Sequence, residues 1–260
     1  MITPLILTFN EQENLERTLR RLGWAAEIVV VDSGSTDRTL EIAAGFQNVR
    51  VLNRPFDNHT NQWNFGVDQC RTNWILSLDA DYCLSAGLES ELRDWDFNDG
   101  VDAWFAGFHY CIFGRPIRAS LYPDRAVLFR RDRCNYIDDG HTQLLRIPGQ
   151  TARLLNPIYH DDRKPLSRWL VEQAKYARHE ARKLRSVDRE SLGFHDRIRI
   201  LILPASPLVL IYTLIAQGLL LNGWRGWFYS LQRTYVELLL SLFLLDARLR
   251  SRLPQNPSND

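Results

Sequence analysis

Short apolar runs alternate with amphipathic stretches through about residue 155 of the chain. The apolar runs are rich in Ile, Val and Leu and bounded by polar turns, which is typical of buried strands; they cover residues 2–8, 27–32, 49–53 and 74–78. The stretches between them have helical spacing and cover residues 11–22, 35–44 and 60–70. The pattern therefore predicts strands and helices in strict alternation.

Such an alternation predicts an α/β fold. Continuous apolar strands joined by helices indicate a doubly wound, mostly parallel sheet that is covered on both faces. From residue 101 to 155 the runs become shorter and aromatic-rich, which predicts mixed or antiparallel strands that complete the domain. Ligands of open α/β sheets gather at the carboxyl ends of the strands, and Asn10, Asp32 and Asp79 each lie at such an end.

The last third of the chain has a different character. Residues 163–189 contain nine Lys or Arg against three acidic residues, a local charge of +6 on a predicted helix. Residues 200–221 then form a run of 22 residues without a charge. That length can cross a bilayer, whereas Pro204 and Pro207 suit a broken or re-entrant helix equally well.

Aromatic and charged residues follow the uncharged run. Residues 223–229 place Trp and Tyr beside an Arg, as at a membrane interface, and residues 235–245 carry Glu237 and look interfacial. The alternative is a helical subdomain in which 200–221 is buried core and the basic helix is merely solvated. We favour the membrane interpretation, because so long an uncharged run beside a basic helix is uncommon in a soluble protein of this size.

These boundaries predict three regions: an α/β domain over residues 1–160, a basic helix with membrane-associating helices over 161–253, and a disordered tail over 254–260. The 260 residues are 45% hydrophobic and 24% charged, which excludes a disordered or collagen-like chain. The net charge of +1 gives no overall attraction to nucleic acid, so we expect no nucleic-acid partner.

The four cysteines fit no metal-binding spacing and are too few for a disulfide scaffold, so we expect reduced thiols in the cytosol. The first residues lack a basic leader and form too short an apolar run for a signal peptide, so we do not expect secretion.

Paired carboxylates carry the main chemical signal. Asp79 and Asp81 lie one residue apart after an apolar strand, where they can reach a divalent cation that also holds a diphosphate. Such a pair taken alone is also compatible with a polar turn. Residues 32–37 follow another strand with the small residues of a tight turn, and Asp32 is placed to accept a hydrogen bond from a ribose or a base.

Four ordered segments resemble the family 2 glycosyltransferases of the GT-A fold. They are TFNE at 8–11, VVVDSGSTDRT at 29–39, QWNFG at 62–66 and WILSLDAD at 74–81. The similarity covers about residues 1–160, and the subgroup it resembles is that of the lipopolysaccharide-core β-glucosyltransferases. The resemblance implies an inverting enzyme with a nucleotide-sugar donor, for which we expect a UDP-sugar, and a divalent metal, Mg²⁺ or Mn²⁺. It also implies a lipid-linked glycan acceptor, and so a protein associated with the cytoplasmic face of the inner membrane.

The same resemblance implies roles for individual residues. The nucleotide-sugar would be held by Thr8, Asn10, Glu11, Asp32, Gln62, Asn64 and Asp79. Asp81 would bind the metal, and His160 lies where many GT-A enzymes supply a last ligand from a distant loop, although a lone His is more often structural. Arg125 or Arg130 would meet the donor phosphate or the acceptor, with a surface salt bridge as the alternative.

The catalytic base is the least defined element of the pattern. The subgroup usually has an acid where this chain has Tyr82, and His-Glu where it has His141 and Thr142. Asp138 and Asp139 still place two carboxylates beside His141, and inversion needs one carboxylate within reach of the acceptor hydroxyl. We expect Asp139 to be the base, because it is nearer His141; the alternatives are Asp138, or a pair that only caps a turn.

Three other functions remain open at this point. Transfer to a polyprenyl phosphate, as in the dolichyl-phosphate mannose synthases, needs no base because the acceptor is already an anion. A non-catalytic membrane adaptor with a nucleotide-binding fold is a second alternative. A nucleotidyltransferase is the third, and the absence of a Gly-rich phosphate loop with Arg or Lys near the start of the sequence speaks against it.

Overall fold

The computed structural model describes residues 1–95, 100–138, 143–202 and 204–251, and divides the chain into two compact units. The first unit is Met1–Lys164 and the second begins at Pro165. The tail predicted at 254–260 lies outside the described residues.

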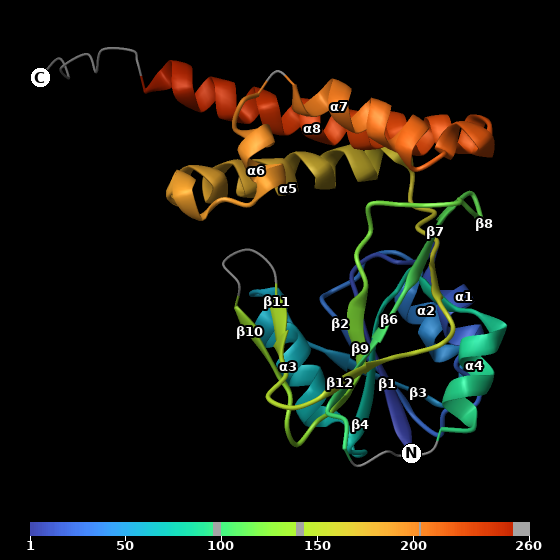
Figure 1. The fold of residues 1–260 in the computed structure, drawn as a ribbon. Helices are drawn as coiled ribbons and strands as arrows, with labels where there is room; N and C mark the ends of the chain where they lie inside the picture. The colour runs from blue at the N-terminus through green and yellow to red at the C-terminus, as the bar shows by residue number, and fades with distance from the viewer. Residues whose placement is uncertain (96–99, 139–142, 203, 252–260) are drawn as a thin grey trace, which may run out of the picture. The chain divides into compact units, whose positions relative to one another are not determined.

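A seven-stranded sheet forms the centre of the first unit (Figure 1). Its strands are β1 (Ile2–Thr8), β2 (Ile28–Asp32), β3 (Val49–Asn53), β4 (Trp74–Asp79), β6 (Ala103–Ala106), β9 (Arg125–Arg130) and β12 (Thr151–Arg153). Their order across the sheet is β12-β6-β9-β4-β1-β2-β3. The four strands from β4 to β3 are parallel, whereas β9 runs antiparallel to β4 and to β6. The predicted α/β fold is therefore confirmed, as a mixed sheet.

Two smaller sheets complete the first unit. Strands β5 (Tyr82–Leu84), β13 (Ile158–His160), β7 (Phe108–Ile112) and β8 (Arg115–Pro116) form one in that order, and β10 (Asn135–Asp138) and β11 (Gln143–Arg146) form an antiparallel pair. In the first of these sheets β13 runs antiparallel to β5, with His160 opposite Tyr82. This register brings His160 next to the segment that follows the paired carboxylates.

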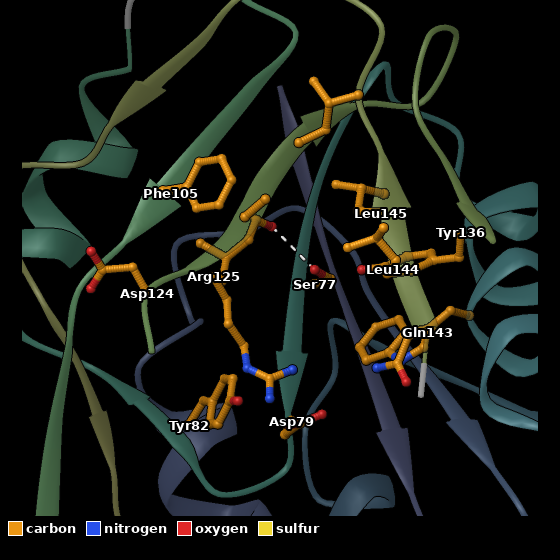
Figure 2. A pocket seen from close by; sticks show the side chains of 14 residues that line it. Ser77, Asp79, Tyr82, Phe105, Asp124, Arg125, Tyr136, Gln143, Leu144 and Leu145 are labelled. Carbon is orange, nitrogen blue, oxygen red and sulfur yellow. Dashed lines mark hydrogen bonds between the residues drawn. The ribbon is translucent and has the colours of Figure 1, made fainter. Parts of the chain in front are cut away.

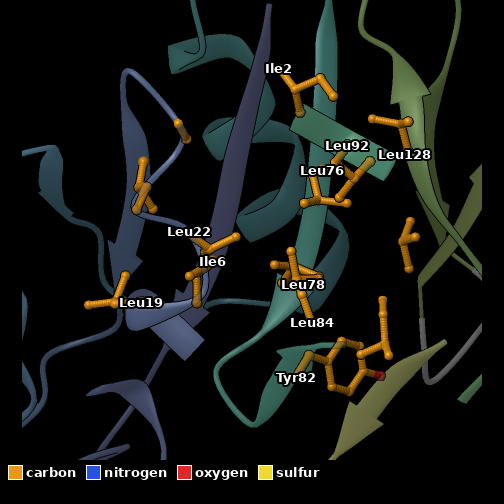
Figure 3. Packing of buried hydrophobic residues seen from close by; sticks show 14 of the residues in the cluster. Ile2, Ile6, Leu19, Leu22, Leu76, Leu78, Tyr82, Leu84, Leu92 and Leu128 are labelled. Atoms are coloured by element: carbon orange, nitrogen blue, oxygen red, sulfur yellow. The ribbon is translucent and has the colours of Figure 1, made fainter. Parts of the chain in front are cut away.

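Helices cover both faces of the seven-stranded sheet. They are α1 (Leu15–Arg20), α2 (Thr39–Ala44), α3 (His59–Gln69) and α4 (Ala86–Arg93). Successive strand residues point to opposite faces, so Ile6 packs in a cluster with Leu19 of α1 (Figure 3), while its neighbour Leu5 packs with Trp63 of α3. Two apolar cores, one on each face, thus hold the strand ends in place.

The second unit is helical. It contains α5 (Leu166–Ser186), η1 (Arg189–Ser191), α6 (Phe194–Arg199), α7 (Ala205–Ile211), η2 (Tyr212–Ala216), η3 (Leu219–Asn222) and α8 (Trp224–Arg250). Small and branched side chains such as Ala177, Ala181, Leu240 and Leu244 form a core between α5 and α8. Inside this unit Arg199 donates two hydrogen bonds to the buried Glu237, with N–O distances of 2.7 and 3.1 Å.

The uncharged run 200–221 is not one helix. It begins after the end of α6 and contains the seven residues of α7, the π-helical turn η2 and most of the 3-10 turn η3, with Gly218 at a φ of +68° between the last two. Among the described residues, no helix combines the length and the apolar character that crossing a bilayer requires.

Candidate functional site

Three of the predicted site residues meet at the carboxyl edge of the parallel strands. Thr8 lies opposite Asp32 in the β1–β2 pairing, and Asp79 lies opposite Leu7 in the β1–β4 pairing. Thr8 Oγ1 donates a hydrogen bond of 3.0 Å to Asp32 Oδ1. The fold therefore brings Thr8 and Asp32 into contact and places Asp79 at the same edge of the sheet.

Asp32 organises the loop that follows its own strand. The side chain is fully buried, and its Oδ2 accepts hydrogen bonds from the backbone N–H groups of Gly34 and Ser35 at 2.9 and 2.8 Å. Its Oδ1 accepts from Ser35 Oγ as well as from Thr8. With four protein donors around it, the carboxylate fixes the loop that follows β2, and its contact with the nucleotide stays a prediction.

Asn10 and Glu11 tie the first strand end to the same loop. Asn10 has a φ of +55°, a left-handed conformation that Asn tolerates. Its Oδ1 accepts from the backbone N–H of Thr36 at 2.8 Å, and the N–H of Glu11 donates to Thr39 Oγ1 at 2.7 Å. The two loops thus form one connected rim at the strand ends.

Gln62 and Asn64 are also engaged inside the protein. The buried Gln62 donates to Ser33 Oγ at 3.0 Å and accepts from the Arg54 guanidinium. Asn64 pairs with the backbone of Tyr136 in both directions, donating to the carbonyl at 2.8 Å and accepting from the N–H at 2.9 Å. Asn64 therefore holds β10 against α3.

Asp81 and His160, predicted as metal ligands, are in contact. Nε2 of His160 lies 3.2 Å from Oδ2 of Asp81, although 79 positions separate the two residues in the sequence. The backbone N–H of Asp161 donates to the Asp81 carbonyl at 3.0 Å, which continues the alignment of β13 beside β5. Rings of Tyr82, Tyr110 and Tyr122 surround the imidazole, with centroid distances to His160 of 5.4, 4.8 and 4.4 Å.

The two carboxylates have opposite electrostatic environments. Burial and the negative charge of Asp81 raise the pKa of Asp79, and nearby Arg125 only partly offsets this. Burial would also raise the pKa of Asp81, but the charge and hydrogen bond of His160 and the charge of Lys164 outweigh it, so that this pKa is lowered. For His160, burial would lower the pKa, but Asp81 and Asp79 raise it.

The donor set fits a divalent cation that is shared with a diphosphate. A phosphate-bound Mg²⁺ takes one or two protein carboxylates and completes its shell with phosphate oxygens and water, and Mn²⁺ also suits carboxylate ligands. Asp81 and His160 supply one oxygen and one nitrogen at a buried point, and Nδ1 of His160 has no hydrogen-bond partner among the described residues. In the part of the chain that the structure describes, no third His, Cys, Asp or Glu joins them in a group able to hold a metal by itself.

Lys164 is a residue of this site that the sequence analysis did not single out. Its Nζ lies 2.8 Å from Glu11 Oε1 and 3.7 Å from Asp162 Oδ1. Burial would lower the pKa of Lys164, but the charges of Glu11 and Asp162 raise it, so the side chain is a cation near Asp81. Fully buried Asn14 donates both to Glu11 Oε2 and to Asp162 Oδ1, each at 2.9 Å, which fixes this cluster. The only signal in the sequence was the start of the basic stretch at 163.

A cavity of about 190 Å³ opens beside Asp79 (Figure 2). Its walls come from β4, β9, α3 and the β10–β11 pair, and they include Trp63, Phe105 and Leu145. Figure 2 shows the Arg125 guanidinium extending toward Asp79 and Tyr82, and it lies 5.2 Å from the Tyr122 ring centre.

The other candidate cation, Arg130, and the base candidate Asp138 are not among the residues that line this cavity. Arg130 forms an ion pair with Asp132 at 3.0 Å and does not line the cavity. Asp138 is exposed at the end of β10, next to the β11 residues that line the cavity. Asp139, the expected base, and His141 lie outside the described residues.

The cysteines take no part in this site. All four are free thiols, and burial raises the pKa of each, to about 12 for Cys70 and Cys111 and to about 11 for Cys134. They are therefore weak nucleophiles at neutral pH.

Comparison with known proteins places these residues in a family context. The sequence model described as Glycosyl transferase family 2 matches residues 5–146, more than half of the chain. The lipopolysaccharide core biosynthesis glycosyltransferase LpsC of Rhizobium meliloti is 32% identical over 97 residues, which cover 36% of this chain and 36% of LpsC. An undecaprenyl-phosphate 4-deoxy-4-formamido-L-arabinose transferase of Pseudomonas fluorescens is 36% identical over 94 residues, 31% of this chain and 27% of that protein.

These matches are partial. The chain spans only about a third of the length of the curated relatives that it matches. The crystal structure of S. aureus TarS 1–349 in complex with UDP-GlcNAc gives a TM-score of 0.48 at 13% identity, covering 96% of this chain and 92% of TarS. No ligand is assigned to this chain from a likeness at that level.

Proposed function

We propose, from the premise that this chain belongs to glycosyl transferase family 2, that it is a metal-dependent, inverting glycosyltransferase. It moves a sugar from a nucleotide-sugar donor, a UDP-sugar, to a hydroxyl of a lipid-linked or cell-envelope glycan of the lipopolysaccharide-core type, at the cytoplasmic face of the inner membrane. The observation that carries the proposal is the contact of Asp81 with His160, beside Asp79, at the carboxyl edge of the parallel strands.

The donor would lie along the rim at this edge. The loops fixed by Asn10 and Asp32 form the wall for the nucleotide, and Asp79 at the end of β4 faces the cavity where the sugar would sit. Asp81 and His160 would hold a Mg²⁺ or Mn²⁺ ion, which when bound neutralises charge that develops on the departing diphosphate. Arg125 and Lys164 are the cations of this region and would add to that neutralisation.

The acceptor proton needs a base on the opposite side of the sugar. Inversion places the attacking hydroxyl opposite the leaving diphosphate, so the carboxylate that takes its proton lies across the cavity from Asp81. The β10–β11 pair forms a wall of that cavity, and Asp138 is the last residue of β10. Asp139 follows it in the sequence and lies outside the described residues. The Asn64 contacts to Tyr136 hold this wall in place. Asp139 remains our choice for the base.

The choice of acceptor is supported by the relative from Rhizobium meliloti, which acts in lipopolysaccharide core biosynthesis. A second candidate acceptor is a polyprenyl phosphate, favoured by the similarity to the undecaprenyl-phosphate transferase. The two candidates differ in their need for a base, because a phosphate acceptor is already an anion. An Asp138→Asn/Asp139→Asn double variant would lose transfer to a hydroxyl but keep transfer to a phosphate.

The test is an incubation of the purified chain with a panel of nucleotide sugars and Mn²⁺, with and without lipid extract. Release of nucleoside diphosphate is measured, and the expected result is release from one UDP-sugar that rises when acceptor is present and falls in excess EDTA. Absence of release with every donor, or full release in EDTA, would contradict the proposal. The matched control for Asp81→Ala is Asp68→Ala, which removes an exposed carboxylate near the C-terminal end of α3.

A further inference from the structure

The exposed surface of the second unit is apolar to an unusual degree. Seven positions of α8 between Trp224 and Leu245 are exposed, and all seven are Leu, Trp or Tyr: Trp224, Trp227, Leu231, Tyr235, Leu238, Leu242 and Leu245. Their spacing of three or four residues places them along one side of the helix. The opposite side contains Tyr229, Leu240 and Leu244 and is buried in the unit.

The apolar surface continues onto the neighbouring segment. Helix α7 packs along α8 (Figure 1), and the exposed large side chains of α7 and the two turns after it are Leu208, Ile211, Tyr212, Ile215, Leu220 and Leu221. We call these six and the seven on α8 the apolar face. Among the described residues from 201 to 245, none of the exposed ones is charged. A monomeric protein rarely leaves so many large apolar side chains together in water.

The charges of this segment are turned inward instead. Glu237 is buried, and Arg199 holds it with two hydrogen bonds while also contacting Glu180 at 3.3 Å. Arg225 covers the Trp224 ring, 4.6 Å from its centre. The helix therefore carries charged residues without exposing one within the apolar face.

The rest of the unit is basic. Residues 165–251 contain thirteen Lys or Arg against seven Asp or Glu, a net charge of +6. Exposed cations lie along α5, including Lys175, Arg182 and Lys183, and at the end of α8, where Arg248 and Arg250 follow the last residues of the apolar face. Two copies of such a unit meeting face to face would bring like charges together, whereas an anionic lipid surface would be attracted to them.

We propose that the apolar face inserts in the plane of an anionic lipid bilayer, without crossing it. Trp224 and Trp227 at the start of α8 suit the headgroup region, and the Leu and Ile side chains suit the acyl boundary. Arg248 and Arg250, which follow the face on α8, would meet anionic lipid headgroups. This deepens the proposed membrane location by naming the surface and its mode of contact. It also joins the run 200–221 and the segments 223–229 and 235–245 into one face, of which seven residues lie on α8.

The experiment is flotation of the full-length chain with vesicles of phosphatidylethanolamine and phosphatidylglycerol (3:1), in low salt and in 1 M salt. The variant L231S/L238S/L242S removes apolar side chains without changing charge, and L155S/L166S removes exposed leucines outside the apolar face as a matched control. The wild type and the control should float in both salts, because burial of apolar surface is little screened by ions. The triple variant should bind at least about 100-fold more weakly, given the free energy of burying three Leu side chains.

Either of two flotation results would overturn the proposal. One is that the wild type does not float, and the other is that the triple variant floats as well as the control. Sedimentation velocity of the same proteins tests whether the apolar face instead binds a second copy of the chain. If the wild type forms a dimer and does not bind vesicles, and the triple variant is monomeric, the face belongs to a dimer interface. Vesicles of phosphatidylcholine, which carry no net charge, test the contribution of charge. If the chain binds them as tightly as vesicles that contain phosphatidylglycerol, the proposed attraction to anionic headgroups is wrong. Because vesicle binding needs no donor or acceptor, failure here would leave the proposed transfer reaction standing.

Discussion

Helices α3 and α8 follow opposite rules about what faces water. The exposed positions of α3 are His59, Asn61, Asp68 and Gln69, all polar, and its apolar side chains pack on the sheet. The exposed positions of α8 up to Leu245 are all apolar, and its carboxylate Glu237 is buried. One helix is built for water on its outer side and the other for an apolar environment.

The same contrast holds for charge. The first unit has 18 Lys or Arg against 23 Asp or Glu, a net charge of −5, whereas residues 165–251 have a net charge of +6. The overall charge of +1 conceals this division. The two proposals assign the chemistry to the first unit and the membrane attachment to the second. Each prediction below changes one unit and asks whether the other responds.

The largest effect is expected at the metal site. Asp81→Ala should lower kcat/KM by about 10³-fold or more, because a bound metal contributes several kcal/mol of transition-state stabilisation. Vesicle binding should not change. Steady-state release of nucleoside diphosphate and vesicle flotation measure the two, with Asp68→Ala as control; turnover equal to that of the control would refute the metal role.

The next effect concerns the base. Asp139→Asn preserves the shape of the side chain but cannot accept a proton, so transfer to a hydroxyl acceptor should fall by about 10² to 10⁴ with donor affinity little changed. Single-turnover transfer and nucleotide binding by calorimetry separate these quantities. If Asp138→Asn shows the loss and Asp139→Asn does not, the base is the neighbouring residue.

Removal of a buried carboxylate from the second unit should lower the free energy of unfolding and leave nucleotide binding unchanged. Glu237→Ala leaves Arg199 without its buried partner, and removing one member of a buried pair costs about 3 to 5 kcal/mol. The contacts of Arg199 with Glu180 and Asp196 remain, so we expect the lower end of that range. Urea unfolding followed by circular dichroism measures the loss; a matching loss of nucleotide affinity would show that the units are not separate in function.

A smaller effect should sharpen the role of Asn64. Asn64→Leu removes both hydrogen bonds to the Tyr136 backbone, a cost of about 1 to 3 kcal/mol if those groups remain unpaired. If Asn64 positions the β10–β11 wall, kcat should fall while the KM for the donor stays near that of the wild type. A rise in donor KM with unchanged kcat would instead support the nucleotide contact implied by the family resemblance.

Much of the first unit was predictable because its signals are local. The runs of Ile, Val and Leu predicted β1, β2, β3 and β4 to within one residue at each end. Strands β1, β2 and β4 are buried on both faces and so need apolar residues throughout, whereas the edge strand β3 is only partly buried. The first two helices were predicted too long at their starts, whereas α3 was predicted to within one residue. Helix α1 begins at Leu15 rather than near residue 11, because Asn10 and Glu11 are used to join two loops.

Contacts between segments that are distant in the sequence were harder to predict. Only the family resemblance predicted that Asp81 and His160 act together as metal ligands. The pairing of β13 with β5, which brings them into contact, depends on the whole fold. Asp32 was predicted to face a ribose, and nothing in the sequence showed that Thr8, Gly34 and Ser35 would use its oxygens.

The second unit shows the same limit. The two segments 223–229 and 235–245 were treated separately, yet both belong to α8. Glu237 made residues 235–245 look interfacial, because its buried partner Arg199 lies 38 positions away and on another helix. The direction in which an apolar residue faces depends on packing, so the apolar face was visible only in the structure.

The most direct test compares two reactions of the same proteins: transfer to a lipid-linked acceptor in anionic vesicles, and hydrolysis of the donor in solution without acceptor. The variant L231S/L238S/L242S should lose most of the vesicle reaction and keep the hydrolysis, whereas Asp81→Ala should lose both. This result is predicted if the first unit performs the chemistry and the second unit brings it to the membrane. Equal loss of both reactions in the triple variant, or equal retention, would contradict that division.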